Sequence, residues 1–416
     1  MLYIFEDKNW KNFLPIAYTR PVFDLRTGIF KLKQKIKIAF KNYNVAYLLR
    51  PELEAVYTDR FPNKKVNVLE PGKHIFVNAT SRLNSELINT INNLKDNEAI
   101  FYNDTCLAFR KNIEQKQSLD STKISGLYST LKKKTVDNKP YQYTWELIES
   151  NASEIKNEFS TFSYIKKKNY FSPVSYYFTN TDKNIFFGAD VKVEPGVYLD
   201  AIAGPIIIDD NAKIMANAVI KGPTYIGKNS KIKASAKIYE GTSIGKVCKV
   251  GGEVEETIIQ AYSNKQHDGF LGHAYLGEWV NIGADTNNSD LKNNYEHIKA
   301  YSYTEDNLIS TNMQFFGLLM GDHTKTGINT MFNTGSVVGI GCNLFGSELF
   351  KGFIPSFSLG EGDRRTHQTV YKMIETARKV KNRRNLELTN NEAELLRSIY
   401  EKTKQIRRKY NKRKRN

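Results

Sequence analysis

The sequence predicts an α/β domain, then a parallel β-helix of hexapeptide repeats, then C-terminal helices. Two observations carry this prediction. Before residue 165, short apolar runs alternate with segments of helical spacing; beyond it, an aliphatic residue recurs at every sixth position. The predicted divisions are an α/β domain, a connector, the β-helix, and helices with a basic tail, at 1–165, 166–185, 186–360 and 361–416.

The first domain alternates between two kinds of segment. Helical spacing with a polar face marks 28–41 and 84–95. Short apolar runs indicate strands at 1–7, 44–50, 74–79 and 98–104. Strands that alternate with helices favour a mainly parallel sheet covered by those helices.

The repeat is the strongest pattern in the chain. Beginning at Ile202, steps of six lead to Ile208, Ile214, Ile220, Ile226, Ile232, Ile238, Ile244 and Val250. Small residues recur at the same step at Ala212, Ala218, Thr224, Ser230, Ala236, Thr242 and Cys248. This period fits neither a helix nor an ordinary strand, but it fits a solenoid whose sides are single hexapeptides. We expect the aliphatic residues to stack inside the prism and the small residues to fill its corners.

The period breaks twice, which predicts two excursions from the prism. After Val250 it returns out of phase at Leu276 and Ile282, with Val280 and Thr286 as the small or short partners. It breaks again over 287–312 and resumes at Met320, Phe332, Val338 and Leu344, with small positions at Thr324, Thr330, Ser336 and Cys342. Loops that leave a rigid scaffold often carry function.

The C-terminal region has helical spacing at 364–383 and 389–409, and the second helix opens with a capping box formed by Thr389 and Glu392. We expect these helices to cover the open end of the prism or a neighbouring subunit. The chain ends in a basic tail without a hydrophobic anchor, which predicts a frayed, solvated helix end; its residues are Arg407, Arg408, Lys409, Lys412, Arg413, Lys414 and Arg415.

Composition narrows the class of protein. The net charge of +17 comes from lysine spread along a chain rich in asparagine and isoleucine, as an A+T-rich coding sequence produces, so a nucleic-acid partner is not expected. The three cysteines, Cys106, Cys248 and Cys342, are far apart and indicate core residues. No apolar run is long enough for a membrane helix and no secretory signal opens the chain, so we expect a cytoplasmic protein.

Three motifs point to a family. The elements His267-x-x-Phe-Leu-Gly, Val-Asn281-Ile-Gly-Ala and Asn294-Tyr295 resemble the HxxYLG, VNIGA and NY elements of the bifunctional UDP-N-acetylglucosamine pyrophosphorylase/glucosamine-1-phosphate N-acetyltransferases. The segment Thr19-Arg-Pro21, with Leu25-Arg-Thr-Gly28, is similar to the opening of the Bacteroidetes-type branch. The resemblance implies a nucleotidyltransferase-like α/β domain, a left-handed β-helix and synthesis of a cell-envelope precursor.

The resemblance also implies an assembly and a set of site residues. The β-helix would form a homotrimer, with acetyl-CoA in the groove between neighbouring prisms and the amino sugar phosphate under the ejected loop. His267 would be the general base, and acetyl-CoA would approach the backbone near Gly283 and Ala284. Substrate would be held by Glu253, Asn281, Asn294 and Tyr295, with Lys265, Lys292 and Lys299 near its phosphate.

The chemistry suits these residue types. Acetyl transfer to an amine requires a group that removes an ammonium proton near neutral pH, which an imidazole does. The alternatives are structural: His267 as a surface or core histidine with a satisfied hydrogen bond, Asn281 as the start of an asparagine ladder, and solvent-facing lysines. A different alternative is a zinc site, because His273 follows His267 by six residues and His297 or His323 could complete three imidazole ligands.

The first domain departs from the family pattern. The glycine-rich LAAGxGTRM loop is absent, so Arg20 and Arg26 are the candidate ligands for nucleotide phosphates. Their alternative role is structural pairing with Asp24 or Glu6. For the Mg²⁺ that uridylyl transfer requires, the candidates are the two aspartates at strand ends, Asp7 and Asp104.

Two other functions stay open. Phe270 stands where the family has tyrosine, and the loop at 287–300 differs in length, which allows an acyltransferase acting on another amino sugar. The second alternative is a non-catalytic protein that binds a sugar nucleotide through a degenerate first domain.

Overall fold

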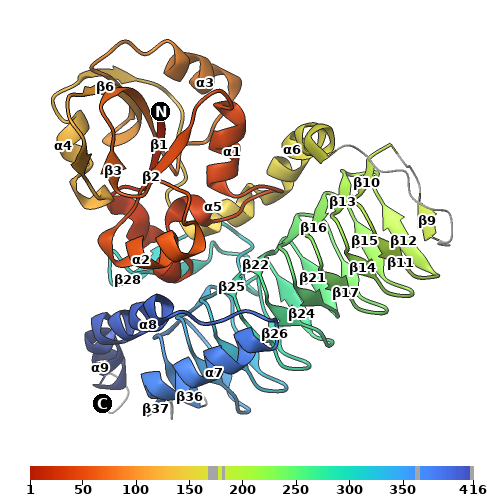
Figure 1. Ribbon diagram of the computed structural model, residues 1–416. Coiled ribbons are helices and arrows are strands. Elements are labelled where there is room, and N and C mark those ends of the chain that lie inside the picture. The colour runs from red at the N-terminus through yellow and green to blue at the C-terminus, as the bar shows by residue number, and fades with distance from the viewer. Residues whose placement is uncertain (167–176, 180–182, 361–365, 413–416) are drawn as a thin grey trace.

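The computed structural model describes residues 1–166, 177–179, 183–360 and 366–412. An α/β domain stands beside a long β-solenoid, and the C-terminal helices lie against the later coils (Figure 1). Most of the predicted connector 166–185 lies outside the described residues, as do the tail residues Arg413, Lys414 and Arg415.

The N-terminal domain is built on a six-stranded sheet of order β2-β1-β4-β6-β5-β8. Only β6 runs against the others in this sheet, so the predicted mainly parallel sheet is confirmed. The strands are β1 Leu2–Phe5, β2 Val45–Leu48, β4 Gly72–Asn78, β5 Glu98–Tyr102, β6 Thr105–Ile113 and β8 Lys132–Thr135. The sequence did not predict β6, because a tight turn with Asn103 in the left-handed region divides one apolar stretch into two strands.

Helices and short turns surround this sheet. The two predicted helices are confirmed as α1 Leu32–Ala39 and α3 Ser85–Asn92. The others are α2 Pro51–Arg60, α4 Ser125–Tyr128, α5 Thr144–Glu149 and α6 Asn151–Lys166, and a small strand pair joins β3 Val68–Leu69 to β7 Gln117–Ser118. Between β1 and α1 the chain forms three 3₁₀ turns, at Lys8–Phe13, Ile16–Thr19 and Val22–Asp24.

The solenoid has three parallel faces. The first face contains β10 Ile185–Phe187, β13 Ile206–Ile208, β16 Thr224–Ile226, β19 Thr242–Ile244, β22 Ile258–Ala261, β25 Tyr275–Glu278, β29 Leu318–Met320, β32 Ser336–Val338 and β35 Phe353–Ile354. The second begins with β11 Lys192–Val193, β14 Lys213–Ile214, β17 Lys231–Ile232, β20 Lys249–Val250 and β23 Asn264–Lys265. Asn281 bridges this group to β30 Lys325–Thr326, β33 Asn343–Leu344, β36 Ser358–Gly360 and β37 Thr366–His367. Of these strands, only β37 is antiparallel to its neighbour. The third contains β9 Tyr177–Thr179, β12 Val197–Asp200, β15 Val219–Lys221, β18 Lys237–Ile238, β21 Glu253–Glu255 and β24 Phe270–Gly272, followed by β26 Asn287–Asn288, β31 Met331–Phe332 and β34 Leu349–Phe350.

The aliphatic stack predicted from the repeat forms the solenoid core. From Ile208 to Val250, every predicted aliphatic position is fully buried, and the predicted small residues are buried at the corners. Ile202 is the exception, because it is 74% exposed. Leu199 takes the inward position on that coil instead, and Ile202 lies in the turn that follows β12.

The first predicted excursion is wrong. The chain after Val250 stays in the prism, and strands β21 to β25 continue all three faces. The period shifts because the next inward residue is Val254, only four positions later, across the tight corner at Gly251 and Gly252. A shortened coil therefore changes the phase of the repeat without ejecting a loop.

The second predicted excursion is confirmed. Between β26 and β29 the chain leaves the prism and forms an antiparallel hairpin of β27 Lys299–Ser302 and β28 Asn307–Ser310. We call residues 289–316 the ejected segment. Its buried residues Ile298, Ala300 and Phe316 join the same hydrophobic cluster as the N-terminal domain, so the segment packs between the domain and the solenoid.

The C-terminal helices are α7 Val370–Asn382, α8 Asn390–Lys402 and α9 Lys404–Lys412, and the capping box at the start of α8 is confirmed. They bind the side of the solenoid rather than its open end. Met373 approaches Gly341, Lys381 lies over the Trp279 ring, and Arg384 reaches Asn264, so α7 runs back along the corner between the first and second faces. Helix α8 packs against α2 of the N-terminal domain.

The expected frayed basic end is also wrong over its described part. Arg407 is buried: its guanidinium donates to Thr403 and to the carbonyl of Tyr400, and it lies over the Tyr400 ring at 4.0 Å. Tyr410 packs on Phe353 of β35. Arg407 and Tyr410 therefore anchor α9 to the rest of the protein. The number of basic residues in this segment did not predict these contacts.

A buried ion pair joins the two domains. Arg20 is 1% exposed, and its guanidinium donates to both carboxylate oxygens of Asp322, which lies in the solenoid, at 2.9 and 2.5 Å. Thr19 donates to the same carboxylate at 2.6 Å, and Glu278 lies 3.4 Å from the guanidinium. A charge-assisted, bidentate contact of this kind is strong, and its two hydrogen bonds fix the orientation of the guanidinium relative to the carboxylate.

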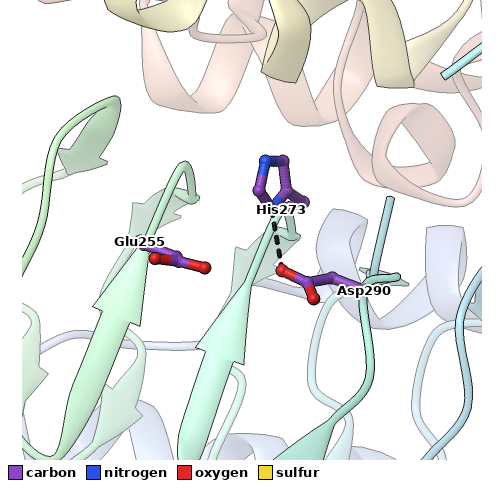
Figure 2. A group of neighbouring side chains, drawn as sticks. All are labelled: Glu255, His273 and Asp290. Carbon is purple, nitrogen blue, oxygen red and sulfur yellow. Dashed lines mark hydrogen bonds and ion pairs between the residues drawn. The ribbon is translucent and has the colours of Figure 1, made fainter. Parts of the chain in front are cut away.

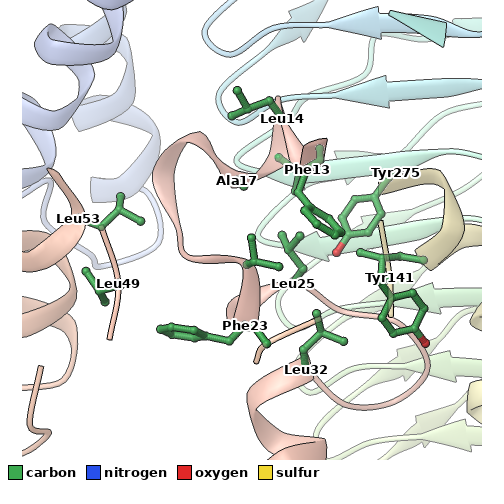
Figure 3. Packing of buried hydrophobic residues seen from close by; sticks show 14 of the residues in the cluster. Phe13, Leu14, Ala17, Phe23, Leu25, Leu32, Leu49, Leu53, Tyr141 and Tyr275 are labelled. Atoms are coloured by element: carbon green, nitrogen blue, oxygen red, sulfur yellow. The ribbon is translucent and has the colours of Figure 1, made fainter. Parts of the chain in front are cut away.

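The rest of the segment 19–28 continues this contact. Gln260 donates to the carbonyl of Asp24, Arg26 donates its backbone N–H to the Tyr275 hydroxyl, and Ser243 donates to the carbonyl of Gly28. Apolar packing accompanies these bonds, with Tyr275 among N-terminal side chains in one buried cluster (Figure 3). We call residues 19–28 the interdomain latch.

None of the helices in the described part of the chain has the length and apolar character that a membrane span requires.

Replacing Asp322 with Asn should destabilise the protein strongly. Arg20 would keep its buried charge but lose the closer of its two carboxylates, with Glu278 left at 3.4 Å, and breaking such a pair costs about 3–5 kcal/mol. Urea unfolding should show a large fall in the midpoint. The matched control is Asp137→Asn at an exposed position of the N-terminal domain, which should change stability by less than about 0.5 kcal/mol. Equal midpoints for the two variants would show that the latch does not depend on this ion pair.

Candidate functional site

The predicted general base lies on an exposed corner between the second and third faces. His267 falls between β23 and β24, and its side chain is exposed to solvent, outside the aliphatic stack. We call residues 266–269, together with 283–286 of the next coil, the His267 corner. The two turns stack directly, because the N–H of Asp285 donates to the carbonyl of Asp268 at 3.0 Å.

Gly283 and Ala284 belong to this corner, one coil after His267. A Cβ atom at Gly283 would lie 2.1 Å from the carbonyl oxygen of Gly327, so close stacking of the coils requires glycine here. The carbonyl of Ala284 accepts a hydrogen bond from Asn329 at 2.8 Å. The backbone expected to approach acetyl-CoA is therefore near His267 along the solenoid axis.

Asn281 is exposed on the second face beside the same corner. Its side-chain oxygen accepts a hydrogen bond from the amide of Asn264 on the preceding coil at 3.4 Å. The alternative of an asparagine ladder beginning at Asn281 is wrong, because the next coil places Lys325 beside it. The Asn281 amide remains open to solvent.

Lys265 does not face a substrate. It occupies the inward position equivalent to Val250 and Ile282, is 1% exposed, and donates to the backbone carbonyl of His267 at 2.7 Å. Burial lowers the pKa of its ammonium group to about 8. The expected contact with a sugar phosphate is corrected to a structural contact that holds the His267 turn.

The other predicted substrate residues lie elsewhere. Asn294, Tyr295 and Lys299 are exposed on the ejected segment, with Tyr295 66% exposed. This segment leaves from the far corner of the third face, one strand away from the His267 corner. Glu253 lies on the third face and pairs with Lys237 at 3.3 Å. Within a single chain, the predicted site residues therefore form two separate groups, one at the His267 corner and one at the far corner of the third face.

Figure 2 shows a group of side chains at the far corner: Glu255, His273 and Asp290. The Nδ1 atom of His273 lies 2.8 Å from Oδ2 of Asp290, and the ring of Phe315 stacks on the imidazole. Burial raises the pKa of Glu255, and it raises that of Glu256, beside it, to about 7. This corner combines an imidazole with several partly desolvated carboxylates.

Sequence reasoning considered His273 but missed its carboxylate partners. Glu255 lies one coil before His273 and Asp290 one coil after it, so the spacing between partners is the coil length and not a short motif. Aligning successive coils by their inward residues would have brought the three together.

The zinc site with three histidines is not formed. His297 is exposed on the ejected segment. His323 is buried at another corner, between the first and second faces, where its ring stacks on Trp279 with ring centroids 6.2 Å apart. In the described ranges, neither histidine joins His273 in a group of potential metal ligands.

The N-terminal aspartates do not present a prepared Mg²⁺ site. Asp7 is buried at the carboxyl end of β1, and its oxygens accept hydrogen bonds from the backbone and side chain of Asn9 and from the Asn78 amide at 2.9 to 3.2 Å. Burial raises the pKa of Asp7. Asp104 is exposed in the turn between β5 and β6. Amide donors already occupy the better placed carboxylate, so this pair does not fit the metal.

The arginines predicted to bind a nucleotide are directed into the protein. Arg20 binds Asp322 in the interdomain latch, and Arg26 donates to the carbonyl of Ile29 while its guanidinium lies 5.0 Å from the Tyr225 ring centroid. The alternative of structural pairing was therefore correct in kind, although neither arginine pairs with Asp24 or Glu6. Glu6 instead binds Arg50 in a buried pair.

Two family models match parts of this chain. Residues 2–166 match the family model described as sugar nucleotidyl transferase, and residues 205–240 match the model described as bacterial transferase hexapeptide. These matches confirm the predicted fold class, which is a nucleotidyltransferase-like α/β domain, a parallel β-solenoid of the left-handed hexapeptide type, and C-terminal helices. They support a transferase with a sugar nucleotidyltransferase domain and a solenoid of transferase hexapeptide repeats.

Individual relatives are distant. The bifunctional sugar-1-phosphate nucleotidylyltransferase/acetyltransferase of Sulfurisphaera tokodaii is 33% identical over 140 residues, which cover 33% of this chain and 34% of that protein. The bifunctional protein GlmU of Rippkaea orientalis is 31% identical over 87 residues, covering 20% and 15%. The chain thus spans about a third or less of these curated relatives. A solved UDP-N-acetylglucosamine acyltransferase from Campylobacter jejuni covers 54% of this chain and 93% of its own, with 14% identity and a TM-score of 0.22.

Replacing Lys265 with Met should stabilise the protein at neutral pH. The pKa of this ammonium group is about 8 in the folded chain, against 10.5 for an ordinary lysine. Because burial disfavours the charged form, the charge lowers the free energy of unfolding most below about pH 8, and this penalty is lost as the pH rises toward 10.5. Wild-type stability should therefore rise between these two values, while Lys265→Met should lack this rise and be more stable by about 1–3 kcal/mol near neutrality.

Urea unfolding of both proteins at about pH 7 and about pH 10 measures this difference. Lys231→Met, at an exposed outward position of β17, is the matched control and should show no such gain. The account would be refuted if the free energy of unfolding of wild type did not rise, relative to that of Lys265→Met, between about pH 7 and about pH 10.

Proposed function

We propose that the solenoid catalyses acetyl transfer from acetyl-CoA to the amine of glucosamine-1-phosphate. The observation that carries the proposal is the position of His267, an exposed histidine on a rigid corner, beside the exposed Asn281 amide and the close-stacked backbone at Gly283 and Ala284. The hexapeptide match over residues 205–240 supports an acyltransferase-like scaffold.

The corner supplies the group that the reaction needs. Neutral His267 accepts a proton from the substrate ammonium group, and the freed amine nitrogen forms a bond to the thioester carbonyl carbon. His267 passes this first proton to solvent and then takes the second proton from the same nitrogen as the carbon–sulfur bond breaks. The departing thiolate receives that second proton from the imidazolium, so the products are the amide, the thiol of CoA and one released proton. A positioned base of this kind contributes typically ~10²–10⁴ in rate. Lys265 supports the step by holding the His267 carbonyl, and with it the turn.

A homotrimer would complete this site. In one chain, Asn294, Tyr295 and Lys299 lie at the far corner of the third face and His267 at the near one. In a threefold assembly of prisms, the near corner of one chain can face the ejected segment of its neighbour, which would form a groove for the pantetheine arm and the sugar phosphate. Hexapeptide solenoid proteins are often trimers, in keeping with this arrangement.

Replacing His267 with Ala should lower kcat for acetyl transfer at least about a hundredfold, because the amine then lacks its base. Thiol release from acetyl-CoA measures the rate, and size-exclusion chromatography checks that assembly is unchanged. Lys231→Ala, which removes an exposed side chain of β17 outside both groups of proposed site residues, is the matched control and should retain the rate. An unchanged rate in His267→Ala would refute the base assignment.

Mass spectrometry decides between acceptors. Products formed from acetyl-CoA and a panel of amino sugar phosphates would separate glucosamine-1-phosphate from another amino sugar, which the phenylalanine at position 270 leaves open.

We also propose uridylyl transfer to N-acetylglucosamine-1-phosphate in the first domain, to give UDP-N-acetylglucosamine. The match of residues 2–166 to a sugar nucleotidyl transferase model supports this activity. The described side chains offer less support, because Arg20, Arg26 and Asp7 are bound to protein groups. The alternative is that this domain binds a sugar nucleotide but catalyses no reaction on it.

The full chain, incubated with UTP, N-acetylglucosamine-1-phosphate and Mg²⁺, should release pyrophosphate. Omission of the sugar phosphate, or addition of a chelator, should abolish the release. Binding of UDP-N-acetylglucosamine without any pyrophosphate release would favour the non-catalytic alternative and refute uridylyl transfer.

A further inference from the structure

The corner that carries His273 brings three coils together. Glu255 ends β21, His273 follows β24, and Asp290 follows β26, which are successive strands of the third face. The parallel register aligns them, since Glu255 is opposite Gly272 and the N–H of His273 donates to the carbonyl of Glu255 at 3.2 Å. Neighbouring strands lie about 4.7–4.9 Å apart, so the three side chains start at a spacing that allows them to converge.

The side chains do converge. One potential ligand atom from each residue lies within 4.8 Å of the other two, and Figure 2 shows the Glu255 carboxylate directed toward the space beside His273 and Asp290. A zinc ion binds nitrogen and carboxylate oxygen at about 2.0–2.2 Å. Ligand atoms of a tetrahedral ion with such bonds stand about 3.4 Å apart. To enclose it, the 2.8 Å contact between His273 Nδ1 and Asp290 would open slightly and the Glu255 carboxylate would move inward.

The carboxylates at this corner outnumber the positive charges near them, of which Lys156 acts on Glu256. Glu255, Asp290 and the adjacent Glu256 are three carboxylates around one imidazole, and no ion pair to Glu255 or Glu256 is found in the ranges that the structure describes. Carboxylates that are partly withdrawn from water need a positive partner. Side-chain exposures of 18% for His273 and 13% for Asp290 leave the group accessible to an ion from solvent.

The imidazole is held in place for this role. His273 has a φ of 44°, in the left-handed region where other solenoid corners carry asparagine, such as Asn211 at 57° and Asn229 at 59°. Phe315, from the end of the ejected segment, stacks on its ring with centroids 5.2 Å apart. A ligand whose orientation is set in advance loses less freedom when a metal binds.

We propose that Glu255, His273 and Asp290 bind one divalent transition-metal ion, such as Zn²⁺. One imidazole nitrogen and two carboxylate oxygens are a ligand set that suits this ion and leaves a fourth position for water. Because Asp290 lies where the ejected segment begins and Phe315 where it ends, the ion ties both ends of that segment to the preceding coils. This site differs from the three-histidine site, and it is independent of the proposed acetyl transfer.

Calorimetric titration of the full chain with Zn²⁺, after removal of metal by a chelator, tests the proposal. Wild type should bind one ion per chain at this corner. His273→Asn, which keeps a residue suited to a positive φ, and Asp290→Asn, which keeps the side-chain shape, should each weaken that binding about tenfold or more. His267→Asn is the matched control, because it removes a histidine from the other corner of the same face, and it should bind like wild type.

A second measurement guards against variants that fold poorly. Zn²⁺ should raise the Tm of wild type and of His267→Asn, and leave the Tm of His273→Asn unchanged while its circular dichroism stays native. Wild type that binds no ion at micromolar Zn²⁺, or His273→Asn and Asp290→Asn that bind as tightly as wild type, would overturn the proposal.

Discussion

The buried contact between Arg20 and Asp322 is the interaction on which the arrangement of the two domains depends. A guanidinium removed from water needs partners for its charge and for its donors, and for Arg20 the Asp322 carboxylate supplies both. The latch also binds the carbonyls and N–H groups of its own backbone to side chains of the solenoid. The segment 19–28 therefore joins the N-terminal domain to the solenoid through both its side chains and its backbone.

A second constraint is the parallel register of the coils. Each coil repeats the direction of the one before it, so residues one coil apart meet at the same corner, however long the chain between them. The His267 corner and the corner of His273 both arise in this way, on opposite edges of the third face. The ejected segment leaves from one of these edges only, which is why a single chain divides the residues of the proposed acyltransferase site into two groups.

The site residues show where pattern reasoning succeeds and where it fails. His267 and Asn281 are exposed near one corner, as their motif suggested, but Lys265, in the same motif, points inward and holds the turn. Nothing in the local sequence distinguishes these outcomes, because lysine is common along the whole chain. The side of the prism that a residue faces depends on the phase of its coil, and a coil shortened at Val254 had shifted that phase.

The architecture could be inferred from the chain alone, because almost all inward positions of the coils favour an aliphatic side chain and so produce a countable period; Lys265 is an exception. The alternating strands and helices of the first domain could also be predicted, because their hydrophobic spacing is a local property of the sequence. Contacts between residues distant in the chain could not be predicted. Arg20 and Asp322 are separated by 302 positions, and Glu255, His273 and Asp290 belong to three coils. Their contacts follow from docking and from coil length, which are properties of the packed molecule that no local pattern encodes.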